Sequence, residues 1–222
     1  CLDSAISFTI GPASPEAHIA LGSYYYHDHD YDRALEEFAL VEKHQPNNVD
    51  APRESGYVHH RQGQWDLALA AFNRSVALDP RSATTWSDLG AILSQMRRYD
   101  AADSCYRRAI TLQPEDASKY VGRAETVIRS EGDLKKAQRI LEDAAPVVAS
   151  SEDLNGLWVR LHVMQGDFGA AAQKLLIVHD DSVGYYLGMA LVHGLRHDTS
   201  TARASAGSSV RKISLPCLYP AS

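Results

Sequence analysis

Apolar residues along most of the chain recur at intervals of three and four positions, as in YDAADSCYRRAITL, residues 99–112. This spacing gives an α-helix one apolar stripe, which is buried against a neighbouring element. Proline follows several of these segments, and it ends a helix because it lacks the required N–H and clashes with the preceding turn. The pattern predicts an all-α protein built from short amphipathic helices.

The pattern repeats with a period of 34 residues. The residues that share this spacing are Pro46, Pro80 and Pro114; Ala34, Ala68 and Ala102; Phe38, Phe72 and Tyr106; and Gly22, Gly56 and Gly90. Small residues let two helices approach closely, so each repeat is predicted to be a packed helix pair. One pair is too small to be stable alone, and stacked pairs bury a shared core and coil into an array with a concave face.

The third repeat, WSDLGAIL followed by YDAADSCYRRAITLQP, resembles a tetratricopeptide repeat. The residues at signature positions of that family are Trp86, Leu89, Gly90, Ala102, Tyr106, Ala109 and Pro114, and Leu93 replaces the usual tyrosine. Residues 15–48 fit as well, whereas residues 49–82 carry Pro52 and Ser55 in the first helix. The resemblance implies an all-α, right-handed superhelical solenoid of antiparallel helix pairs, with about five repeats and partial ends.

The array is predicted to occupy residues 13–198, in segments near 15–48, 49–82, 83–116, 117–150 and 152–180, with a partial repeat at 181–198. Residues 1–12 are interpreted as the end of a preceding, truncated repeat, because Pro12 lies 34 residues before Pro46. Residues 199–222 are rich in Ser and Ala and lose the apolar period, so they are predicted to be a poorly ordered tail.

Composition excludes several classes of function. The formal net charge is −6, and residues 1–198 carry 19 basic against 28 acidic residues, so a nucleic-acid surface is not expected. No apolar run approaches the roughly 20 residues that span a bilayer. The three cysteines lie far apart and form no CxxC motif, which argues against a disulfide framework or a zinc site and favours a reducing compartment, the cytoplasm.

Catalytic signatures are absent from the sequence. It contains no GxSxG, GxxxxGK[ST] or HExxH motif and no kinase signature set. Cys105 lies beside the packing residue Tyr106 and is interpreted as a small buried residue rather than a nucleophile. The sequence therefore predicts a protein that is not an enzyme and needs no cofactor.

The stretch YYYHDHDYD, residues 24–32, is the densest group of chemistry-bearing side chains. A metal-dependent enzyme or switch would use His27, Asp28, His29 and Asp30. However, a metal site needs three or four converging ligands, and two histidines two positions apart near a helix end do not share a face. No metal is expected, and the metal-dependent function remains an alternative.

A turn between paired helices explains the same stretch better. His29 falls where the other turns carry Gly63, Arg97, Gly132 and Gly166, a position that often needs a left-handed backbone. Asp30 precedes the second helix and is placed to cap its free N–H groups. Tyr25 and Tyr31, and at other turns Trp65, Trp86 and Tyr99, fall on packing positions of the family.

The resemblance also implies that the first helix of each repeat lines the concave face. Inward-pointing positions then predict a groove for a polar protein or peptide segment. The residues selected are Tyr26, His27, Arg53, Tyr57, His60, Arg61, Ser94 and Gln95, followed by Glu125 and Arg129. Aromatic and arginine side chains in this set are the expected anchors, because such residues dominate protein interfaces.

The function predicted is a protein-protein interaction module or scaffold within a larger chain. A narrower resemblance concerns the run from HIALGSYYYHDHDYDRALEEF to GYYLGMALVHGL, which is similar to C-terminal repeat arrays of bacterial signalling kinases or adenylate cyclases. It implies a regulatory or sensory segment as an alternative. Self-association through the exposed ends of the array is a further alternative.

Overall fold

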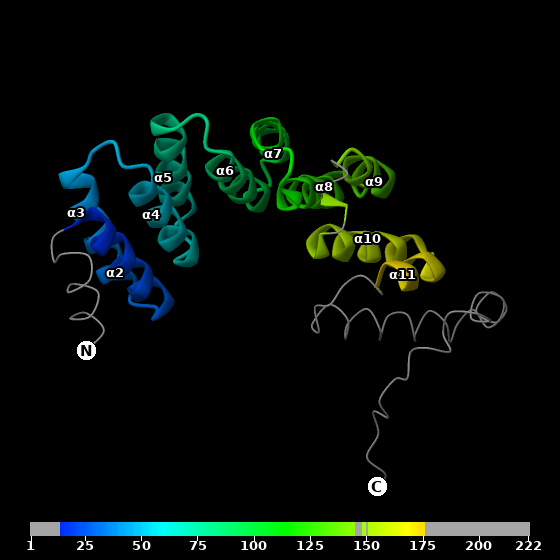
Figure 1. The fold of residues 1–222 in the computed structure, drawn as a ribbon, viewed down its shortest axis with the longest axis horizontal. Coiled ribbons are helices and arrows are strands. Elements are labelled where there is room, and N and C mark those ends of the chain that lie inside the picture. Colours follow the sequence, from blue (N-terminus) through cyan, green and yellow to red (C-terminus); the bar gives the residue numbers. More distant parts are fainter. Residues whose placement is uncertain (1–13, 145–147, 150, 176–222) are drawn as a thin grey trace, which may run out of the picture. The chain divides into compact units, whose positions relative to one another are not determined.

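The computed structural model describes residues 14–144, 148–149 and 151–175 (Figure 1). These residues contain helices and no strand, which confirms the predicted all-α class. The helices are α2 (Pro15–His27), α3 (Tyr31–His44), α4 (Asp50–Arg61), α5 (Trp65–Leu78), α6 (Ala83–Gln95), α7 (Tyr99–Leu112), α8 (Ala117–Glu131), α9 (Leu134–Glu142), α10 (Glu152–Gln165) and α11 (Phe168–Leu175). The predicted segments 1–12, 181–198 and 199–222 lie outside the described residues.

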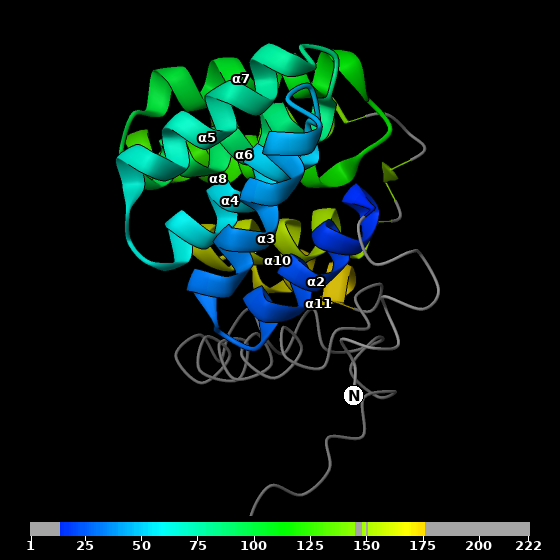
Figure 2. The ribbon, with the colours of Figure 1, turned by 90° about the vertical axis from the view of Figure 1, so that its left-hand side faces the viewer.

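The chain divides into two units, residues 1–140 and 141–222. In the first unit α2 packs on α3, α4 on α5 and α6 on α7. Figures 1 and 2 show the second helices α5 and α7 on one side of this unit and the first helices α4, α6 and α8 on the other. Since α2 contacts α4 and α6 contacts α8, the first helices form a row of their own.

The turns between paired helices share a backbone conformation. A positive φ angle of 60° to 77° occurs at His29, Gly63, Arg97, Gly132 and Gly166. The value of 65° at His29 confirms the conformation predicted from its alignment with glycines. This left-handed residue reverses the chain after the first helix of each pair.

Polar residues before α3 and α6 cap the first turns of these helices. Asp30 accepts a hydrogen bond from the backbone N–H of Arg33 at 3.3 Å, as its predicted capping role requires. Ser82 does the same for Thr85 at 3.3 Å before α6. These bonds satisfy N–H groups that have no partner inside the helix.

Close contacts between glycine and aromatic rings hold the layers of the first unit together. A Cβ atom at Gly22 of α2 would lie 2.5 Å from Cε1 of Phe38, whose side chain is fully buried in α3. A Cβ atom at Gly122 of α8 would lie 2.6 Å from Cε1 of Tyr106 in α7. Any larger residue at these glycines would displace a ring that has no free space around it.

The prediction that Trp65 belongs to the core is wrong, because 39% of its surface is exposed. Trp65 is the first residue of α5, and its ring packs on His60 of α4, with 5.2 Å between centroids. Trp86 and Tyr99 are half-buried. The indole N–H of Trp86 donates to the carbonyl of Pro80 at 3.0 Å, so this ring covers the connection between α5 and α6.

In the second unit, the helix pair α10 and α11 packs around a buried polar side chain. The amide of Asn155 is fully buried and donates to the carbonyls of Ala149 and Ser151, at 3.1 and 2.9 Å. Its carbonyl accepts from Nζ of Lys174 at 3.3 Å, and that ammonium lies 5.7 Å from the ring centroid of Trp158. This network links the start of α10 to α11.

Among the helices α2 to α11, none combines the length and the apolar character needed to cross a lipid bilayer.

Candidate functional site

Tyr26 and Arg61, two of the predicted groove residues, are bonded to each other across successive first helices. Nε of Arg61 in α4 donates to the hydroxyl of Tyr26 in α2 at 3.0 Å, and the guanidinium carbon lies 6.0 Å from the ring centroid. The ring of Tyr26 also packs on Tyr31, with 6.2 Å between centroids. We call Tyr26, Tyr31 and Arg61 the first junction. His27 is exposed beside it, with its ring centroid 5.4 Å from that of Tyr26.

His60 and Gln95 make the same kind of link one repeat later. Nε2 of His60 in α4 lies 2.9 Å from Oε1 of Gln95 in α6. The imidazole packs edge-on against the exposed ring of Trp65, at 5.2 Å between centroids. We call His60, Trp65 and Gln95 the second junction. At each junction, the ring of Tyr26 or His60 therefore packs on an aromatic side chain of its own repeat. The polar edge of that ring is hydrogen-bonded to a side chain of the next repeat.

The remaining predicted residues on α6 and α8 differ in accessibility. Ser94 is only 4% exposed and accepts a hydrogen bond from Thr126 Oγ1 at 3.1 Å, so it joins α6 to α8 and offers no open surface. Arg129 is exposed and lies 3.9 Å from the carboxylate of Glu125 on the same helix. Of these three, only the charged pair on α8 is placed to meet a partner.

Arg53 is held by acidic residues of its own helix. Its Nη2 lies 3.1 Å from Asp50 Oδ1 and 3.2 Å from Glu54 Oε1. Burial is the largest single influence and would lower the pKa of Arg53, but the attraction to Glu54 and Asp50 and the hydrogen bond to Glu54 together outweigh it and raise the pKa. Burial raises the pKa of Glu54, an effect that Arg53 only partly offsets. The guanidinium is therefore part of a charged cluster rather than a free anchor.

Asp88 extends this cluster to the next first helix, α6. Its carboxyl group interacts with the Tyr57 hydroxyl, yet Oδ2 is buried and has no hydrogen-bond partner among the described residues. Burial raises the pKa of Asp88, although Tyr57, Arg53 and Lys119 act in the opposite direction. Burial likewise raises the pKa of Tyr57, whose ring packs on Phe72 at 5.2 Å. Charged and hydroxyl side chains therefore connect the first helices α4 and α6.

Sequence analysis did not recognise Glu54, Asp88 and Lys119 as one cluster. The available signal was the interval of 34 residues between Glu54 and Asp88, which brings equivalent positions of adjacent repeats together. Lys119 is 2% exposed and paired with Asp116, and a lysine at a helix start gives no indication of such burial.

The described residues offer no assembled catalytic or metal centre at the stretch 24–32. Across residues 14–144, 148–149 and 151–175, no three His, Cys, Asp or Glu side chains come together as a metal site. His29 and Asp30 carry the turn and the helix cap. Cys105 is buried, and burial raises the pKa of its thiol to about 11, so the thiol is protonated near neutral pH.

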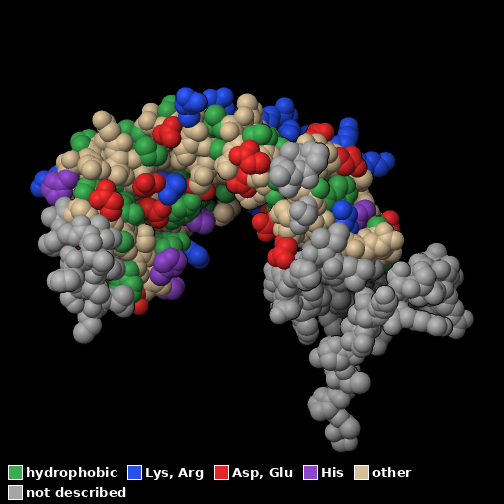
Figure 3. Space-filling model, viewed as in Figure 1, with side chains coloured by type: hydrophobic (Ala, Val, Ile, Leu, Met, Phe, Trp, Pro, Cys, Tyr) green, Lys and Arg blue, Asp and Glu red, His purple; other side chains and the backbone are tan. Residues whose placement is uncertain are grey.

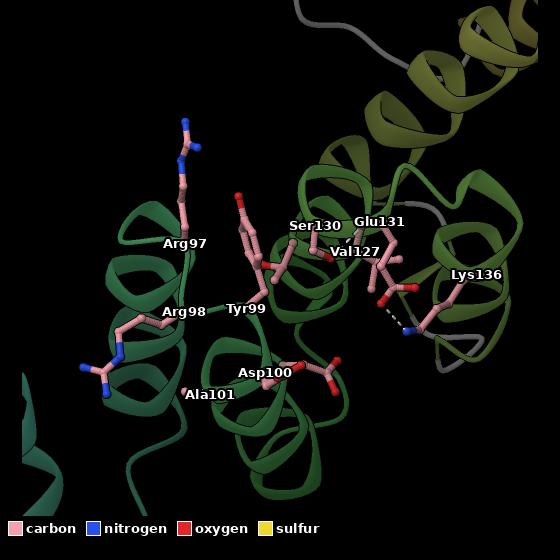
Figure 4. A pocket seen from close by; sticks show the side chains of 11 residues that line it. Arg97, Arg98, Tyr99, Asp100, Ala101, Val127, Ser130, Glu131 and Lys136 are labelled. Carbon is pink, nitrogen blue, oxygen red and sulfur yellow. Dashed lines mark hydrogen bonds and ion pairs between the residues drawn. The ribbon is translucent and has the colours of Figure 1, made fainter.

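A pocket of about 440 Å³ lies between the turn that joins α6 to α7 and the end of α8 (Figure 4). The residues that line it include Tyr99, Asp100, Thr126, Val127, Ser130 and Glu131. Glu131 is paired with Lys136 at 2.6 Å on one side. In Figure 4, Tyr99 stands between the turn and the Val127–Ser130 side of α8. Arg97 and Arg98 of the turn also line the pocket.

Comparison with known families decides what the helix stack is. Two family models, both described as tetratricopeptide repeat, match residues 19–83 and 56–129. The chain belongs to the tetratricopeptide repeat family. This confirms the resemblance drawn from the third repeat and the predicted solenoid of helix pairs. Tetratricopeptide repeats are generally protein-protein interaction modules and typically non-enzymatic scaffolds.

Solved structures of other tetratricopeptide repeat proteins share the fold. PilF of Pseudomonas aeruginosa is 19% identical with a TM-score of 0.69, covering 86% of this chain and 88% of its own. TTC0263 of Thermus thermophilus is 19% identical with a TM-score of 0.65, covering 81% and 100%. MamA of Desulfovibrio magneticus is 15% identical with a TM-score of 0.58, covering 84% and 97%. At these identities the likeness concerns the fold alone.

A search of curated proteins found no match. The narrower resemblance to arrays of bacterial signalling kinases and cyclases therefore stays a prediction.

Proposed function

We propose that residues 14–140 form a non-enzymatic interaction module that binds a polar segment of a partner protein. The segment lies across the first-helix face, which we define as the exposed side of α2, α4, α6 and α8. The observation that carries this proposal is the pair of junctions on that face. At both, polar and aromatic side chains of successive first helices bond to each other and remain partly open to solvent.

Preorganised side chains favour binding because they lose little conformational freedom when a partner arrives. Tyr26, His60 and their partners are already oriented by neighbouring repeats, and they present hydroxyl, imidazole, amide and guanidinium groups. Such groups match the amides and side chains of a polypeptide. Neighbouring helices pack about 8–10 Å apart, so each repeat faces two or three residues of an extended segment.

Charge on the face fits a polar segment rather than a strongly charged one. Arg53 is neutralised by Asp50 and Glu54, and Arg129 lies near Glu125. Basic side chains gather instead along the upper edge of Figure 3, above the second helices α5 and α7. The first-helix face and the side formed by the second helices therefore differ in charge. An arginine on the second-helix side can serve as a matched control for one on the first-helix face.

The test is selection of binding segments from a library of random peptides on the full chain, followed by measurement of Kd for two variants with the same charge change. Arg61→Glu alters the exposed end of the first junction, whereas Arg108→Glu alters an exposed residue of the second helix α7. We expect Arg61→Glu to weaken binding about tenfold or more. Arg108→Glu should change Kd less than about twofold.

Equal effects of the two variants on every selected peptide would overturn the groove assignment. Sedimentation of the full chain over a range of concentrations tests the self-association alternative. If the chain dimerises and Arg61→Glu abolishes the dimer, the first-helix face serves a second copy instead of a partner segment.

A further inference from the structure

The left-handed residue of each turn provides a register in which successive repeats can be compared. Tyr26, His60 and Ser94 lie three positions before the left-handed residue of their own repeat, and Tyr31, Trp65 and Tyr99 lie two positions after it. Each is compared with a residue of the following repeat. Arg61, Gln95 and Ser130 lie two positions before the left-handed residue of that following repeat. The first two members of each series form the first and second junctions. Ser94, Tyr99 and Ser130 are the equivalent third junction.

The third junction keeps its aromatic residue but lacks the ring that the other two contain. At the first junction the ring of Tyr26 packs on Tyr31, and at the second His60 packs on Trp65. The corresponding residue at the third is Ser94, which has no ring to pack on Tyr99 and contacts the next repeat through Thr126 instead of Ser130. Among the described residues, no ring packs on Tyr99 as Tyr26 does on Tyr31.

Both serines of the third junction are bonded within the helix layer instead of to each other. Ser94 accepts from Thr126 at 3.1 Å, and Ser130 donates to the carbonyl of Val127 at 3.2 Å. The pocket of about 440 Å³ lies beside Tyr99 and Ser130 of this junction. Tyr99, Thr126 and Ser130 all line it.

We propose that this pocket receives an aromatic side chain with a polar edge, tyrosine or histidine, from the bound partner segment. The ring would complete the third junction as Tyr26 and His60 complete the first two. This inference rests on the proposed function, since the ring belongs to the segment on the first-helix face. The inference specifies that the partner segment carries a tyrosine or histidine at the position that faces this pocket.

The lining of the pocket selects such a ring over an aliphatic side chain. Tyr99 offers an aromatic surface, and aromatic pairs gain from their geometry beyond the area they bury. Ser130 is exposed and places a hydroxyl oxygen at the pocket, where it can accept a hydrogen bond from the edge of a ring, and the Glu131–Lys136 pair forms a polar wall. An aliphatic group would cover these polar atoms without bonding to them, which costs free energy. The volume lies within the range of roughly 300–1,000 Å³ typical of pockets for small organic groups.

The experiment is a titration of the full, isotope-labelled chain with N-acetyl-L-tyrosinamide, followed by the amide NMR signals of Tyr99, Val127 and Ser130. We expect saturable shifts of these signals. N-acetyl-L-leucinamide, the aliphatic control, should bind about two- to tenfold more weakly, the ratio that an aromatic pair supplies.

Variants that fill the pocket provide the second arm. Ser94→Tyr restores the ring found at the first junction and should remove the shifts. Because Ser94 is buried, Ser130→Tyr at an exposed position is the second filling variant. Ser104→Tyr, at an exposed position of α7 outside the pocket, is the matched control and should leave the titration unchanged.

Equal binding of the leucine and tyrosine compounds, shifts confined to other residues, or unchanged binding by a folded filling variant would each overturn the inference. The peptides selected by binding to the full chain distinguish failure of the ring pocket from failure of the proposed function. If they bind in an Arg61-dependent manner but show no tyrosine or histidine preference, the groove stands and the ring pocket fails.

Discussion

The interface between the two helix layers and the first-helix face of residues 14–140 follow different rules. Between the layers, Gly22 meets Phe38 and Gly122 meets Tyr106 at distances that leave no room for a methyl group. On the first-helix face, Tyr26 and His60 bond to residues of the next repeat while remaining partly exposed. The first arrangement stabilises the fold by close packing. The second leaves polar groups ordered at a surface, which is what recognition of a partner requires.

Overpacking the layer interface should produce the largest effect. Ala102 is fully buried, and its carbonyl oxygen would lie 3.3 Å from a Cβ atom at Gly90. We expect Ala102→Leu to lower the free energy of unfolding by about 1–3 kcal/mol, because the helices cannot separate without losing other contacts. Chemical denaturation measures this change. The matched substitution Ala39→Leu, at an exposed position of α3, should stay within about 0.5 kcal/mol, and a similar cost for both would contradict the packing account.

The carboxyl groups of Asp88, on the first helix α6, and Asp103, on the second helix α7, should change the stability of the fold in opposite directions as pH rises. Burial raises the pKa of Asp88, so the fold favours its neutral form, and the wild type loses stability as pH rises from about 3.9 through the folded pKa. Asp103 on α7 is the reverse case. Burial would raise its pKa, but hydrogen bonds from Arg123 and Arg107 are stronger together and lower it. Its contribution is present above the unfolded pKa and is lost as pH falls through the folded pKa.

Melting temperatures of Asp88→Asn and Asp103→Asn between about pH 2.5 and about pH 7.5, a range that includes the ordinary aspartate pKa of about 3.9 and values below it, test this contrast. Relative to the wild type, Asp88→Asn should become more stable as pH rises, whereas Asp103→Asn should become less stable. Parallel pH profiles for the two variants would show that the Asp88 carboxylate is not penalised by burial.

The smallest effect is expected at the turns, which belong to neither region. His29 has a φ angle of 65°, which glycine adopts without steric cost. We therefore expect His29→Gly to be neutral or to stabilise by at most about 1 kcal/mol in chemical denaturation. The control His27→Gly, at the last residue of α2, should cost about 0.3–0.5 kcal/mol, the difference in helix propensity between histidine and glycine. Destabilisation by both substitutions to the same extent would refute the backbone account of His29.

The helix pairs could be predicted from sequence because their signals are local and recur. The interval of 34 residues places Gly22, Gly56 and Gly90 at equivalent contacts, and each of them meets an aromatic ring in the second helix. The capping role of Asp30 and the left-handed backbone at His29 followed from the same alignment. Trp65 was misplaced, since a position in the repeat does not reveal how much of a side chain at the start of a helix stays exposed.

The candidate groove was only partly accessible to sequence reasoning. The ten selected residues remain a prediction as partner contacts, and the structure changes what several of them can offer. Ser94 is buried, and Arg53 is held by two acids. Sequence reasoning treated these side chains singly, whereas their accessibility depends on bonds between successive repeats.

By itself, the sequence determined the all-α repeat fold, because periodic apolar, glycine and proline positions act through contacts within one repeat. Only the tertiary structure decided which side chains of the first helices meet. Tyr26 reaches Arg61, and His60 reaches Gln95, whereas Ser94 and Ser130 leave a pocket beside Tyr99. Those contacts join residues 35 or more positions apart, and they depend on side-chain length and on the spacing between helices, which the repeat pattern does not encode.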